Sequence, residues 1–301
     1  MSGAEVQEIH CKTMLNRIDV PGFPFKWTLN PYRGCRHACR YCYARPTHEF
    51  LGLGAGREFE QRVFAKINAP EVLRSEMRKP KWMGEPIAIG TASDPYEPAE
   101  SQYGITRQIL GVLRDFLNPV SITTKGVLVR RDVDVLKELS HEAGVQVAFS
   151  VGSIDEQVWK ETEPGAPSPK ARLEAMKFLV DNGINAGVSI APILPGLSDS
   201  RESIDAVAEA ASNHGAQFLS ANLLFLKPGS KEWFMPFIRE SHPRLAAGYS
   251  QLYRTTYAPR DYTLSVLKVV DEARLRWGLP VPKPPRLLPG PQMQLELALT
   301  A

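Results

Sequence analysis

Three cysteines lie close together in the first part of the chain, at Cys35, Cys39 and Cys42, with the spacing CxxxCxxC. Thiolate sulfur binds soft or borderline metals well, and in a reducing compartment such spacing favours a metal site over a disulfide. A structural zinc ion takes four protein ligands, whereas a [4Fe–4S] cluster on three thiolates keeps one iron open to another ligand. The cysteines therefore predict a metal centre, with an iron–sulfur cluster as the first interpretation.

A structural zinc site is the alternative, and it needs a fourth ligand. The candidates are His37 and Cys11. His37 lies between two of the cysteines, which makes it difficult for all of them to surround one ion. Cys11 stands far ahead of the loop, in a segment without a predicted element. These positions favour the cluster but leave zinc open.

The cysteine loop needs a scaffold, and the sequence predicts one in which strands and helices alternate. A first strand is predicted over residues 25–30, just before the cysteines, and short β-branched runs separated by helical patterns follow it. The further predicted strands are residues 86–90, 120–124, 145–151, 184–191 and 217–224. The predicted helices are residues 102–116, 132–143, 168–182 and 200–214. Glycines follow three of these helices, as C-terminal caps do: Gly144, Gly183 and Gly215.

Repeated strand–helix units favour an α/β fold with a parallel sheet, and right-handed crossovers can roll six of them into an open barrel. In such barrels the binding residues gather at the carboxyl ends of the strands. From about residue 228 helical patterns replace the alternation, and residues 280–291 contain six prolines, which is typical of an extended linker. We therefore predict four parts: an N-terminal arm (1–24), the barrel (25–227), a helical extension (228–279), and a proline-rich linker with an apolar tail (280–301).

The composition excludes several classes of protein. Of 301 residues, 43% are hydrophobic and 23% are charged, which is ordinary for a globular protein and excludes wholesale disorder. The net charge of +3 is too small to indicate nucleic-acid binding by itself, although residues 242–291 carry eight Lys or Arg against three Asp or Glu. No apolar run approaches the length of a membrane span, and the first ten residues lack the apolar core of a secretory signal. We therefore expect a cytoplasmic protein without membrane contact.

The cysteine spacing, with an aromatic residue before the last cysteine and a strand ahead of the loop, resembles that of the radical S-adenosylmethionine (radical SAM) superfamily. Two further segments extend the resemblance, TASDPYEP at residues 91–98 and Thr124-Lys125. Together with residues 30–42 they are similar to the spore photoproduct lyase-related branch, and within it to an uncharacterised group rather than to the lyase itself. The resemblance covers roughly residues 15–278.

This resemblance implies a partial (β/α)6 barrel with a helical C-terminal extension. It implies that Cys35, Cys39 and Cys42 hold a [4Fe–4S] cluster whose open iron binds the amino and carboxylate groups of S-adenosylmethionine (SAM). In the family, one electron from the reduced cluster cleaves SAM to methionine and a 5′-deoxyadenosyl radical, which abstracts hydrogen from the substrate. The electron would come from a donor such as flavodoxin or ferredoxin, while the protein positions the radical and excludes solvent.

The resemblance also assigns cofactor contacts to polar residues near the predicted strand ends: Tyr41, Ser93, Asp94, Lys125 and Ser150. Ser93 and Asp94 suit hydrogen bonds from the ammonium or ribose hydroxyls of SAM, and Lys125 suits its carboxylate. Ser150 suits a ribose hydroxyl, and the Tyr41 ring suits the adenine. Each also has an ordinary alternative, because Ser-Asp-Pro is common in turns, lysines are mostly exposed, serines often bond to backbone, and aromatic rings pack in cores.

Tyr43, one residue after the last cysteine, is the candidate catalytic residue. In the lyase, tyrosines flanking the final cysteine are associated with relaying hydrogen atoms to the cofactor; packing beneath the loop is the alternative. Glu163 and Arg172 also match the related pattern, which would place Arg172 near the cofactor. One position departs from the lyases, which carry a cysteine hydrogen donor where this chain has Ala92. An alanine methyl group has no labile hydrogen, so the usual lyase route is in doubt.

The end of the chain reads QLELAL between Gln294 and Leu299. This pattern resembles the short peptides by which bacterial replication and repair proteins bind the sliding clamp. A proline-rich leash that presents apolar anchors and a glutamine suits docking into a groove of a partner, and folding back onto the domain is the alternative.

Taken together, the sequence predicts a radical SAM enzyme with a lyase-like reaction on nucleic acid, with DNA and a repair reaction as the first interpretation. The resemblance, the basic stretch and the clamp-like tail each contribute to this prediction. Radical modification of RNA, or of a protein or peptide, is an alternative. A non-catalytic binding module with a structural metal is a second alternative from a different class.

Overall fold

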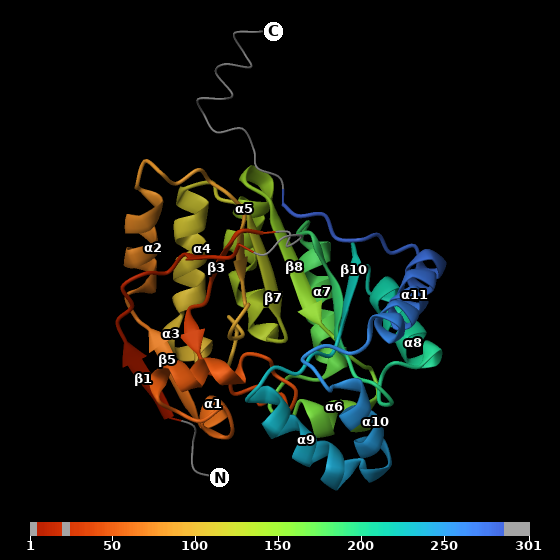
Figure 1. Cartoon of the computed structure of the whole chain (residues 1–301). Coiled ribbons are helices and arrows are strands. Elements are labelled where there is room, and N and C mark those ends of the chain that lie inside the picture. Colours follow the sequence, from red (N-terminus) through yellow and green to blue (C-terminus); the bar gives the residue numbers. More distant parts are fainter. Residues whose placement is uncertain (1–4, 20–24, 286–301) are drawn as a thin grey trace.

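The computed structural model describes residues 5–19 and 25–285, and its centre is a seven-stranded sheet (Figure 1). From one edge to the other, the strands are β10 (Leu219–Leu223), β9 (Ala186–Ile193), β8 (Val145–Ser150), β7 (Val120–Thr124), β6 (Ile87–Ile89), β3 (Trp27–Leu29) and β2 (Asn16–Arg17). All neighbours from β10 to β3 are parallel, and only the edge pair of β2 and β3 is antiparallel. The six parallel strands correspond to the six predicted from the sequence.

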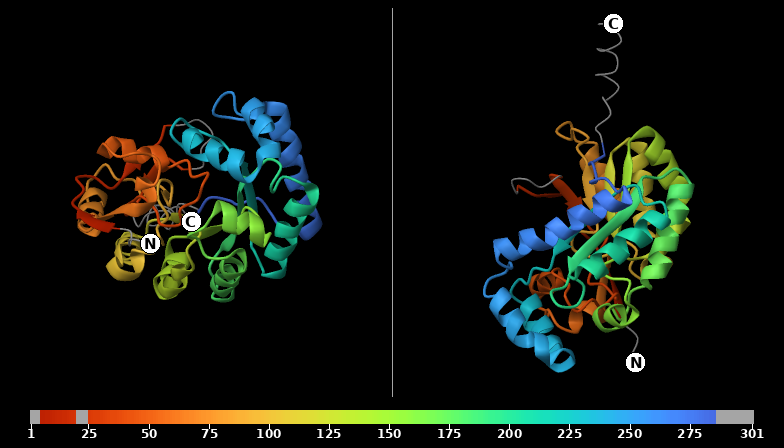
Figure 2. Two further views of the ribbon diagram at one scale, coloured as in Figure 1. Left: turned by 90° about the horizontal axis from the view of Figure 1, so that it is seen from below. Right: turned by 90° about the vertical axis from the view of Figure 1, so that its right-hand side faces the viewer.

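Helices cover the outer face of the curved sheet, as the view from below shows (Figure 2). They are α2 (Ala69–Met77), α4 (Ile105–Asp115), α5 (Val133–Glu142), α7 (Pro169–Asp181), α8 (Arg201–Asn213) and α11 (Arg260–Trp277). In the described part of the chain the edge strands β10 and β2 do not pair with each other. The prediction of an α/β fold with a partial (β/α)6 barrel is therefore confirmed, and the barrel is open.

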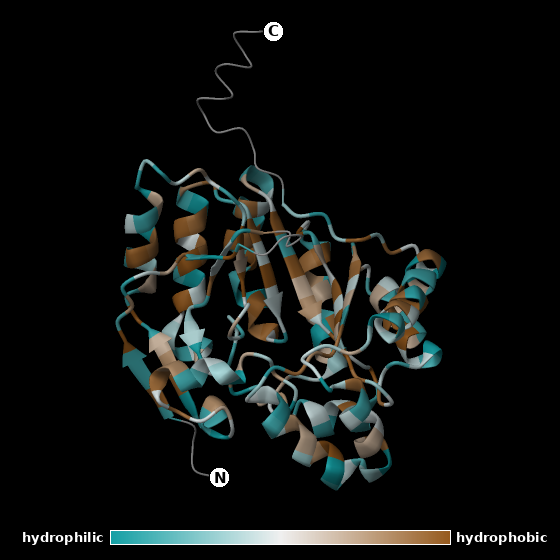
Figure 3. Ribbon diagram, in the orientation of Figure 1, coloured by the Kyte–Doolittle hydropathy of each residue, from teal (hydrophilic) through white to brown (hydrophobic). Residues whose placement is uncertain are grey.

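The parallel strands at the centre of the molecule are largely apolar, as their colours in Figure 3 show. Ile122, Val147 and Val188 are fully or almost fully buried in neighbouring strands, as expected where helices pack on a parallel sheet. Local signals set the helix starts: Ser168 accepts a hydrogen bond from the Ala171 amide at 3.2 Å and so caps α7. Because the parallel strands are buried in this way, their positions agree closely with the strands predicted from the apolar runs of the sequence.

The predicted helix over residues 102–116 is wrong in one respect, because it is divided in two. The short helix α3 (Glu100–Tyr103) ends at Gly104, and α4 begins with the next residue. Gly104 has φ = 61°, in the left-handed region that glycine adopts without steric cost, and this conformation ends α3.

A second, three-stranded sheet was not predicted from the sequence. It consists of β1 (Glu5–Ile9), β5 (Arg62–Lys66) and β4 (Tyr32–Arg33), with β1 parallel and β4 antiparallel to β5. The segment ahead of Cys11, for which we predicted no element, is thus a strand. β4 leads directly into the cysteine loop, which continues into the 3-10 helix η1 (Arg45–Leu51) and then α1 (Glu58–Gln61). The second sheet therefore fixes the start of the loop.

Several helices lie at the end of the barrel toward which the parallel strands point (Figure 1). They are α6 (Glu156–Thr162), α9 (Ser230–Ser241) and α10 (Ala246–Leu252), with the 3-10 helix η3 (Pro243–Leu245) between the last two. A further 3-10 helix, η2 (Val127–Asp132), leads from β7 into α5. None of the described helices has the length and apolar character needed to cross a membrane.

The described start of the proline-rich segment packs against the sheet. The Pro280 carbonyl accepts a hydrogen bond from the Leu219 amide at 2.9 Å, and the Lys283 carbonyl accepts one from the Gln146 side chain at 2.9 Å. Both partners stand near the amino ends of their strands, on the side away from the cysteine loop. The clamp-like stretch between Gln294 and Leu299 lies outside the described residues.

Candidate functional site

The cysteine loop begins with a backbone position that requires glycine. Gly34 has φ = 77°, and a Cβ atom there would lie 2.8 Å from the Phe59 carbonyl oxygen and 2.9 Å from that of Arg62. The next residue, Cys35, donates its amide to the Phe59 carbonyl at 3.0 Å. The loop is thus held closely against α1 and β5 from its first residue.

Side chains from outside the loop hold its backbone carbonyls. The fully buried Arg45 donates two hydrogen bonds to the Cys39 carbonyl, at 3.1 and 2.9 Å, and forms an ion pair with Glu60 at 2.6 Å. The hydroxyl of Ser230, at the start of α9, donates to the Cys42 carbonyl at 2.9 Å. The backbone is fixed by these groups, while all the cysteine thiols are free of disulfides.

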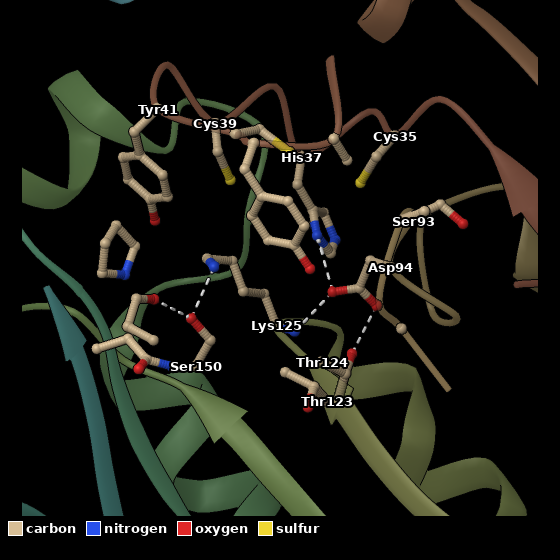
Figure 4. Close-up of a pocket in the computed structure, with 18 of the residues that line it drawn as sticks. Cys35, His37, Cys39, Tyr41, Ser93, Asp94, Thr123, Thr124, Lys125 and Ser150 are labelled. Carbon is tan, nitrogen blue, oxygen red and sulfur yellow. Dashed lines mark hydrogen bonds and ion pairs between the residues drawn. The ribbon is translucent and has the colours of Figure 1, made fainter. Parts of the chain in front are cut away.

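Cys35, Cys39 and Cys42 line one pocket of about 180 Å³ at the carboxyl ends of the parallel strands. Figure 4 shows the sulfur atoms of Cys35 and Cys39 above the side chains that follow the strands. Residues at the ends of β6 to β10 complete the lining: Ala92, Ser93, Asp94, Thr123, Thr124, Lys125, Ser150, Ala191, Pro192, Asn222 and Leu223. Polar side chains at the ends of different strands thus converge on the cysteines, as the α/β prediction requires.

Asp94 joins the cysteine loop to the strand ends. Its carboxylate lies 3.3 Å from Nδ1 of the buried His37, and it accepts hydrogen bonds from the Thr124 hydroxyl at 2.6 Å and the Lys125 amide at 2.7 Å (Figure 4). Burial alone would raise the pKa of Asp94, but His37 and these two donors lower it to about 2. The carboxylate is therefore ionised and fixed in place.

Lys125 is a half-buried cation in the pocket wall. Its ammonium group donates to the Ser150 hydroxyl at 2.7 Å, and that hydroxyl donates to the Ala191 carbonyl at 2.6 Å. The ammonium also lies 3.8 Å from a carboxylate oxygen of Glu163 and 5.6 Å from the centre of the Tyr41 ring. Burial alone would lower the pKa of Lys125, but the negative charges of Glu163, Cys39 and Asp94 together raise it. Lys125 is therefore protonated and faces the pocket.

Glu163 connects Lys125 to the buried side chains behind the pocket. Its carboxylate accepts a hydrogen bond from the Tyr41 hydroxyl and forms an ion pair with Arg172, which is fully buried. Burial alone would raise the pKa of Glu163, whereas the charges of Arg172 and Lys125 lower it. Arg172 also donates to the Ser150 carbonyl at 2.8 Å. Glu163 and Arg172, which match the related sequence pattern, thus belong to one buried network of hydrogen bonds and ion pairs around Tyr41.

Ser93 and Tyr43 line the pocket but use their hydroxyl groups on backbone. The Ser93 hydroxyl donates to the Tyr32 carbonyl at 2.8 Å and is directed away from the pocket centre (Figure 4). The Tyr43 hydroxyl donates to the Thr91 carbonyl at 2.6 Å, and 40% of the residue is exposed. The Tyr43 ring also contacts that of Phe225, and the catalytic role of Tyr43 stays a prediction.

The residues present fit an iron–sulfur cluster with SAM beside it. Three free thiols from one loop line a single pocket, and burial raises the pKa of the Cys39 thiol to about 12, so a bound cation is needed to keep it as thiolate. The protonated Lys125 and the Tyr41 ring supply an anion contact and an apolar face. Among the described residues, no three His, Cys, Asp or Glu side chains are placed to hold a single metal ion.

The two fourth ligands considered for zinc are held by other groups. His37 lies against Asp94, as described above. The Cys11 thiol donates to the side-chain oxygen of Asn68 at 3.4 Å and does not line the pocket. The structure therefore brings three cysteines together and leaves Cys11 apart.

Sequence reasoning missed the contribution of the last strand to the pocket. Asn222 lies where the register between β9 and β10 shifts, and its exposed side chain lines the pocket without a hydrogen bond to any described residue. Phe225, two residues after β10, lines the pocket as well. The polar residue near the end of a predicted strand was the available signal for Asn222.

Comparisons with known proteins agree with this geometry. The model of the family described as the radical SAM superfamily matches residues 29–208. A protein of Mycobacterium tuberculosis named only as uncharacterised is 39% identical over 262 residues, which are 86% of this chain and 77% of that protein. One of Methanocaldococcus jannaschii, also named as uncharacterised, is 34% identical over 198 residues, 66% of this chain and 71% of that protein.

Among solved structures, spore photoproduct lyase complexed with dinucleoside spore photoproduct superimposes with a TM-score of 0.68. The match covers 92% of this chain and 81% of that chain, at 15% sequence identity. At this sequence identity the similarity shows a shared fold and nothing about the activity. In this chain that fold includes the six parallel strands whose carboxyl ends surround the pocket.

Proposed function

Because this chain belongs to the radical SAM superfamily, we propose that it holds a [4Fe–4S] cluster and SAM in the pocket below the cysteine loop and modifies a nucleic acid. The observation that carries the proposal is the convergence of Cys35, Cys39, Cys42 and the half-buried cation Lys125 on one pocket. Membership of this enzyme family sets aside the alternative of a non-catalytic module with a structural metal.

In this proposal the thiolates of Cys35, Cys39 and Cys42 would hold the cluster, and no fourth side chain is assigned to it. When bound, the cluster would supply the single electron needed to split SAM into methionine and, after hydrogen abstraction, 5′-deoxyadenosine. The electron comes from a small donor such as flavodoxin or ferredoxin.

The chain's own residues bind and orient the cofactor. Lys125 attracts the carboxylate of SAM, because its ammonium group lies in the pocket wall, is protonated and is oriented by the Ser150 hydroxyl. The Tyr41 ring, held through its hydroxyl by Glu163, provides the flat surface for the adenine. Asp94 keeps a fixed negative charge beside the loop, where it suits the ammonium group of SAM.

We propose more limited roles for two further residues, Ser93 and Tyr43. The Ser93 hydroxyl is engaged with the Tyr32 carbonyl, so we assign Ser93 to holding the loop edge beside the cofactor. Tyr43 is the hydrogen-relay candidate, because it is partly exposed and carries the phenolic hydroxyl next to the last cysteine. The apolar remainder of the lining, including Ala92 and Leu223, excludes water from the reacting groups.

The proposal that the substrate is a nucleic acid is supported by observations outside the cofactor pocket. Spore photoproduct lyase, with which this chain shares its fold, has been solved with a dinucleoside photoproduct. Residues 242–291 carry eight Lys or Arg against three Asp or Glu, which suits a phosphate backbone. Ala92 in place of a cysteine hydrogen donor makes the lyase reaction by its usual route unsuitable, so we propose a different reaction on nucleic acid, with DNA ahead of RNA.

Anaerobic reconstitution with iron and sulfide, followed by an assay of reductive SAM cleavage, tests the enzyme class. We expect cleavage by the natural chain and by Cys11→Ala, and loss of both cluster and cleavage in Cys39→Ala. A natural chain without bound iron and sulfide after reconstitution contradicts the proposal. Deuterium-labelled DNA, RNA and peptide then test the substrate: transfer of deuterium into 5′-deoxyadenosine from DNA supports repair-like chemistry, and transfer from peptide alone overturns the nucleic-acid substrate.

A further inference from the structure

Three aromatic rings form a continuous row that leads from the pocket to the protein surface. The Tyr43 ring lies 5.2 Å from the Phe225 ring between centroids, and the Phe225 ring lies 5.8 Å from that of Tyr257. The two pairs are tilted by 37° and 34°, so neighbouring rings are closer to parallel than to perpendicular. Tyr43 and Phe225 line the pocket, whereas Tyr257 is 64% exposed. We refer to Tyr43, Phe225 and Tyr257 as the aromatic row.

The backbone that carries the outer part of the row is firmly held. Phe225 and Tyr257 pair as an isolated antiparallel bridge, and the Leu226 amide donates to the Thr256 carbonyl at 2.8 Å. The buried Tyr253 donates its hydroxyl to the Leu224 carbonyl at 2.9 Å. The connection after β10 is therefore tied to the connection between α10 and α11. This leaves Tyr257 exposed on a fixed backbone rather than on a free loop.

A positive charge lies beside the row. The ammonium group of Lys227 lies 5.9 Å from the centre of the Phe225 ring, and Lys227 is exposed and forms no ion pair with another described residue. The aromatic row therefore has a cation next to its middle ring.

These features match one kind of ligand. An exposed ring on a rigid backbone offers a stacking face to an unpaired nucleobase, and the adjacent ammonium group of Lys227 suits a phosphate of the same strand. Proteins that bind single-stranded nucleic acid combine stacking aromatic rings with positive charge in this way, whereas peptide binding does not require stacked rings.

We infer that the aromatic row binds a nucleobase adjacent to the reacting unit, stacked on Tyr257, in an unpaired single strand whose phosphate contacts Lys227. The inference rests on the proposed function and narrows its substrate to a nucleic acid that is single-stranded or locally opened at the reaction site. The reacting unit then enters the pocket past Phe225. A duplex without an opened base is excluded from this binding mode, because its bases are already stacked and paired.

The test measures binding of a fluorescent single-stranded DNA oligonucleotide to the reconstituted full chain by anisotropy, so it does not depend on turnover. We expect Tyr257→Ala to weaken binding roughly 5- to 150-fold, which corresponds to the ~1–3 kcal/mol that stacking of one base contributes. Tyr257→Phe, which keeps the ring, should bind like the natural chain. Lys227→Ala should weaken binding and reduce the dependence on salt, with a slope smaller by about 0.7 per phosphate contact.

Met83→Ala is the matched control, because Met83 is also largely exposed, at 76%, but precedes the amino end of β6 on the opposite side of the sheet. The same oligonucleotide as RNA and as a duplex, and an unlabelled basic peptide as competitor, complete the experiment. Equal affinities of Tyr257→Ala and Met83→Ala overturn the inference, and so does preference for duplex or displacement by the peptide at equal concentration.

SAM cleavage is assayed in the same preparation to separate the two proposals. Cleavage by the natural chain without oligonucleotide binding rejects the aromatic row and leaves the radical SAM activity standing. Oligonucleotide binding that depends on Tyr257, in a chain that contains no cluster after reconstitution, supports the row and rejects the proposed enzyme chemistry.

Discussion

The ammonium group of Lys125 donates a hydrogen bond of 2.7 Å to the hydroxyl of Ser150, so two side chains at the carboxyl ends of the adjacent strands β7 and β8 are joined at the wall of the pocket. The Ser150 hydroxyl in turn donates to the Ala191 carbonyl at the end of β9. Three consecutive strand ends are thereby aligned before any cofactor binds. A prearranged cation of this kind is the feature that an anionic group of a ligand can use without reorganising the site.

Lys125→Met should weaken SAM binding, because it removes the charged group that we propose as the partner of the SAM carboxylate while keeping the apolar stem. A charge-assisted hydrogen bond contributes ~1.5–3 kcal/mol, so we expect an affinity roughly 10- to 150-fold lower. Equilibrium dialysis of labelled SAM against the reconstituted protein measures this change. Lys170→Met, at a largely exposed lysine on α7, serves as the control. Unchanged affinity in the Lys125 variant would show that this cation does not face the cofactor.

Glu163→Gln should strongly destabilise the fold, because it leaves the fully buried Arg172 without its anionic partner. Breaking a buried ion pair on one side costs about 3–5 kcal/mol of unfolding free energy. Replacing both residues with apolar ones should cost less than the single change. Urea unfolding of the single and double variants measures the difference, with Glu174→Gln in an exposed pair expected to cost no more than about 1 kcal/mol.

Gly165→Ala should distort the cysteine loop. Gly165 donates its amide to the His37 carbonyl at 3.1 Å, and a Cβ atom there would overlap the Arg36 carbonyl oxygen. We expect a loss of about 1–3 kcal/mol of unfolding free energy, together with a lower iron content after reconstitution. Gly111→Ala is the matched control, because its added Cβ meets no atom within 4 Å and it lies in the helix α4. That change should stabilise by up to about 1 kcal/mol.

Asp94→Asn should have an effect that depends on pH. The pKa of Asp94 is lowered to about 2, below the value near 3.9 of an unfolded chain, so the ionised carboxylate stabilises the fold above about pH 4 and loses this contribution as the pH falls toward 2. At neutral pH the variant should be less stable by about 1–3 kcal/mol. Urea unfolding from about pH 6 to about pH 3 should show the two proteins converging in acid. A constant difference across this range would argue against an ionised Asp94 in the fold.

Tyr43→Phe should reduce hydrogen supply from exchangeable groups in the pocket. If Tyr43 relays hydrogen, SAM cleavage in D2O without substrate should place deuterium from its hydroxyl into 5′-deoxyadenosine, and the variant should place less. Mass spectrometry of the 5′-deoxyadenosine measures the labelled fraction. Tyr103→Phe, at a tyrosine on α3 that does not line the pocket, is the control and should match the natural chain. Equal labelling by both variants would remove Tyr43 from the relay.

The sequence predicted the parallel strands well, because each is a short β-branched run buried on both faces, such as that containing Ile122 or Val147. The small sheet was missed because β1 and β5 pair across more than fifty residues, and β1 has exposed or half-buried side chains without an apolar pattern. Long-range pairing of this kind leaves little local signal.

The sequence also predicted part of the candidate site. The cysteine spacing and the polar strand ends indicated which residues would meet, and Lys125 and Ser150 do so directly. Sequence spacing did not indicate that the Ser93 hydroxyl would bond to the Tyr32 carbonyl, since that choice depends on how closely β4 approaches the strand end. It also did not indicate the row through Phe225 and Tyr257, because their pairing forms between two connections that are distant in the sequence.

The strands β10 and β2 stand at opposite edges of the sheet and do not pair, so the wall of strands around the pocket is incomplete. In the proposed function, a strand of nucleic acid would lie across this incomplete wall and continue past the protein, with one unit turned toward the pocket. The proposed reaction would then be possible at internal positions of that strand, away from both of its termini.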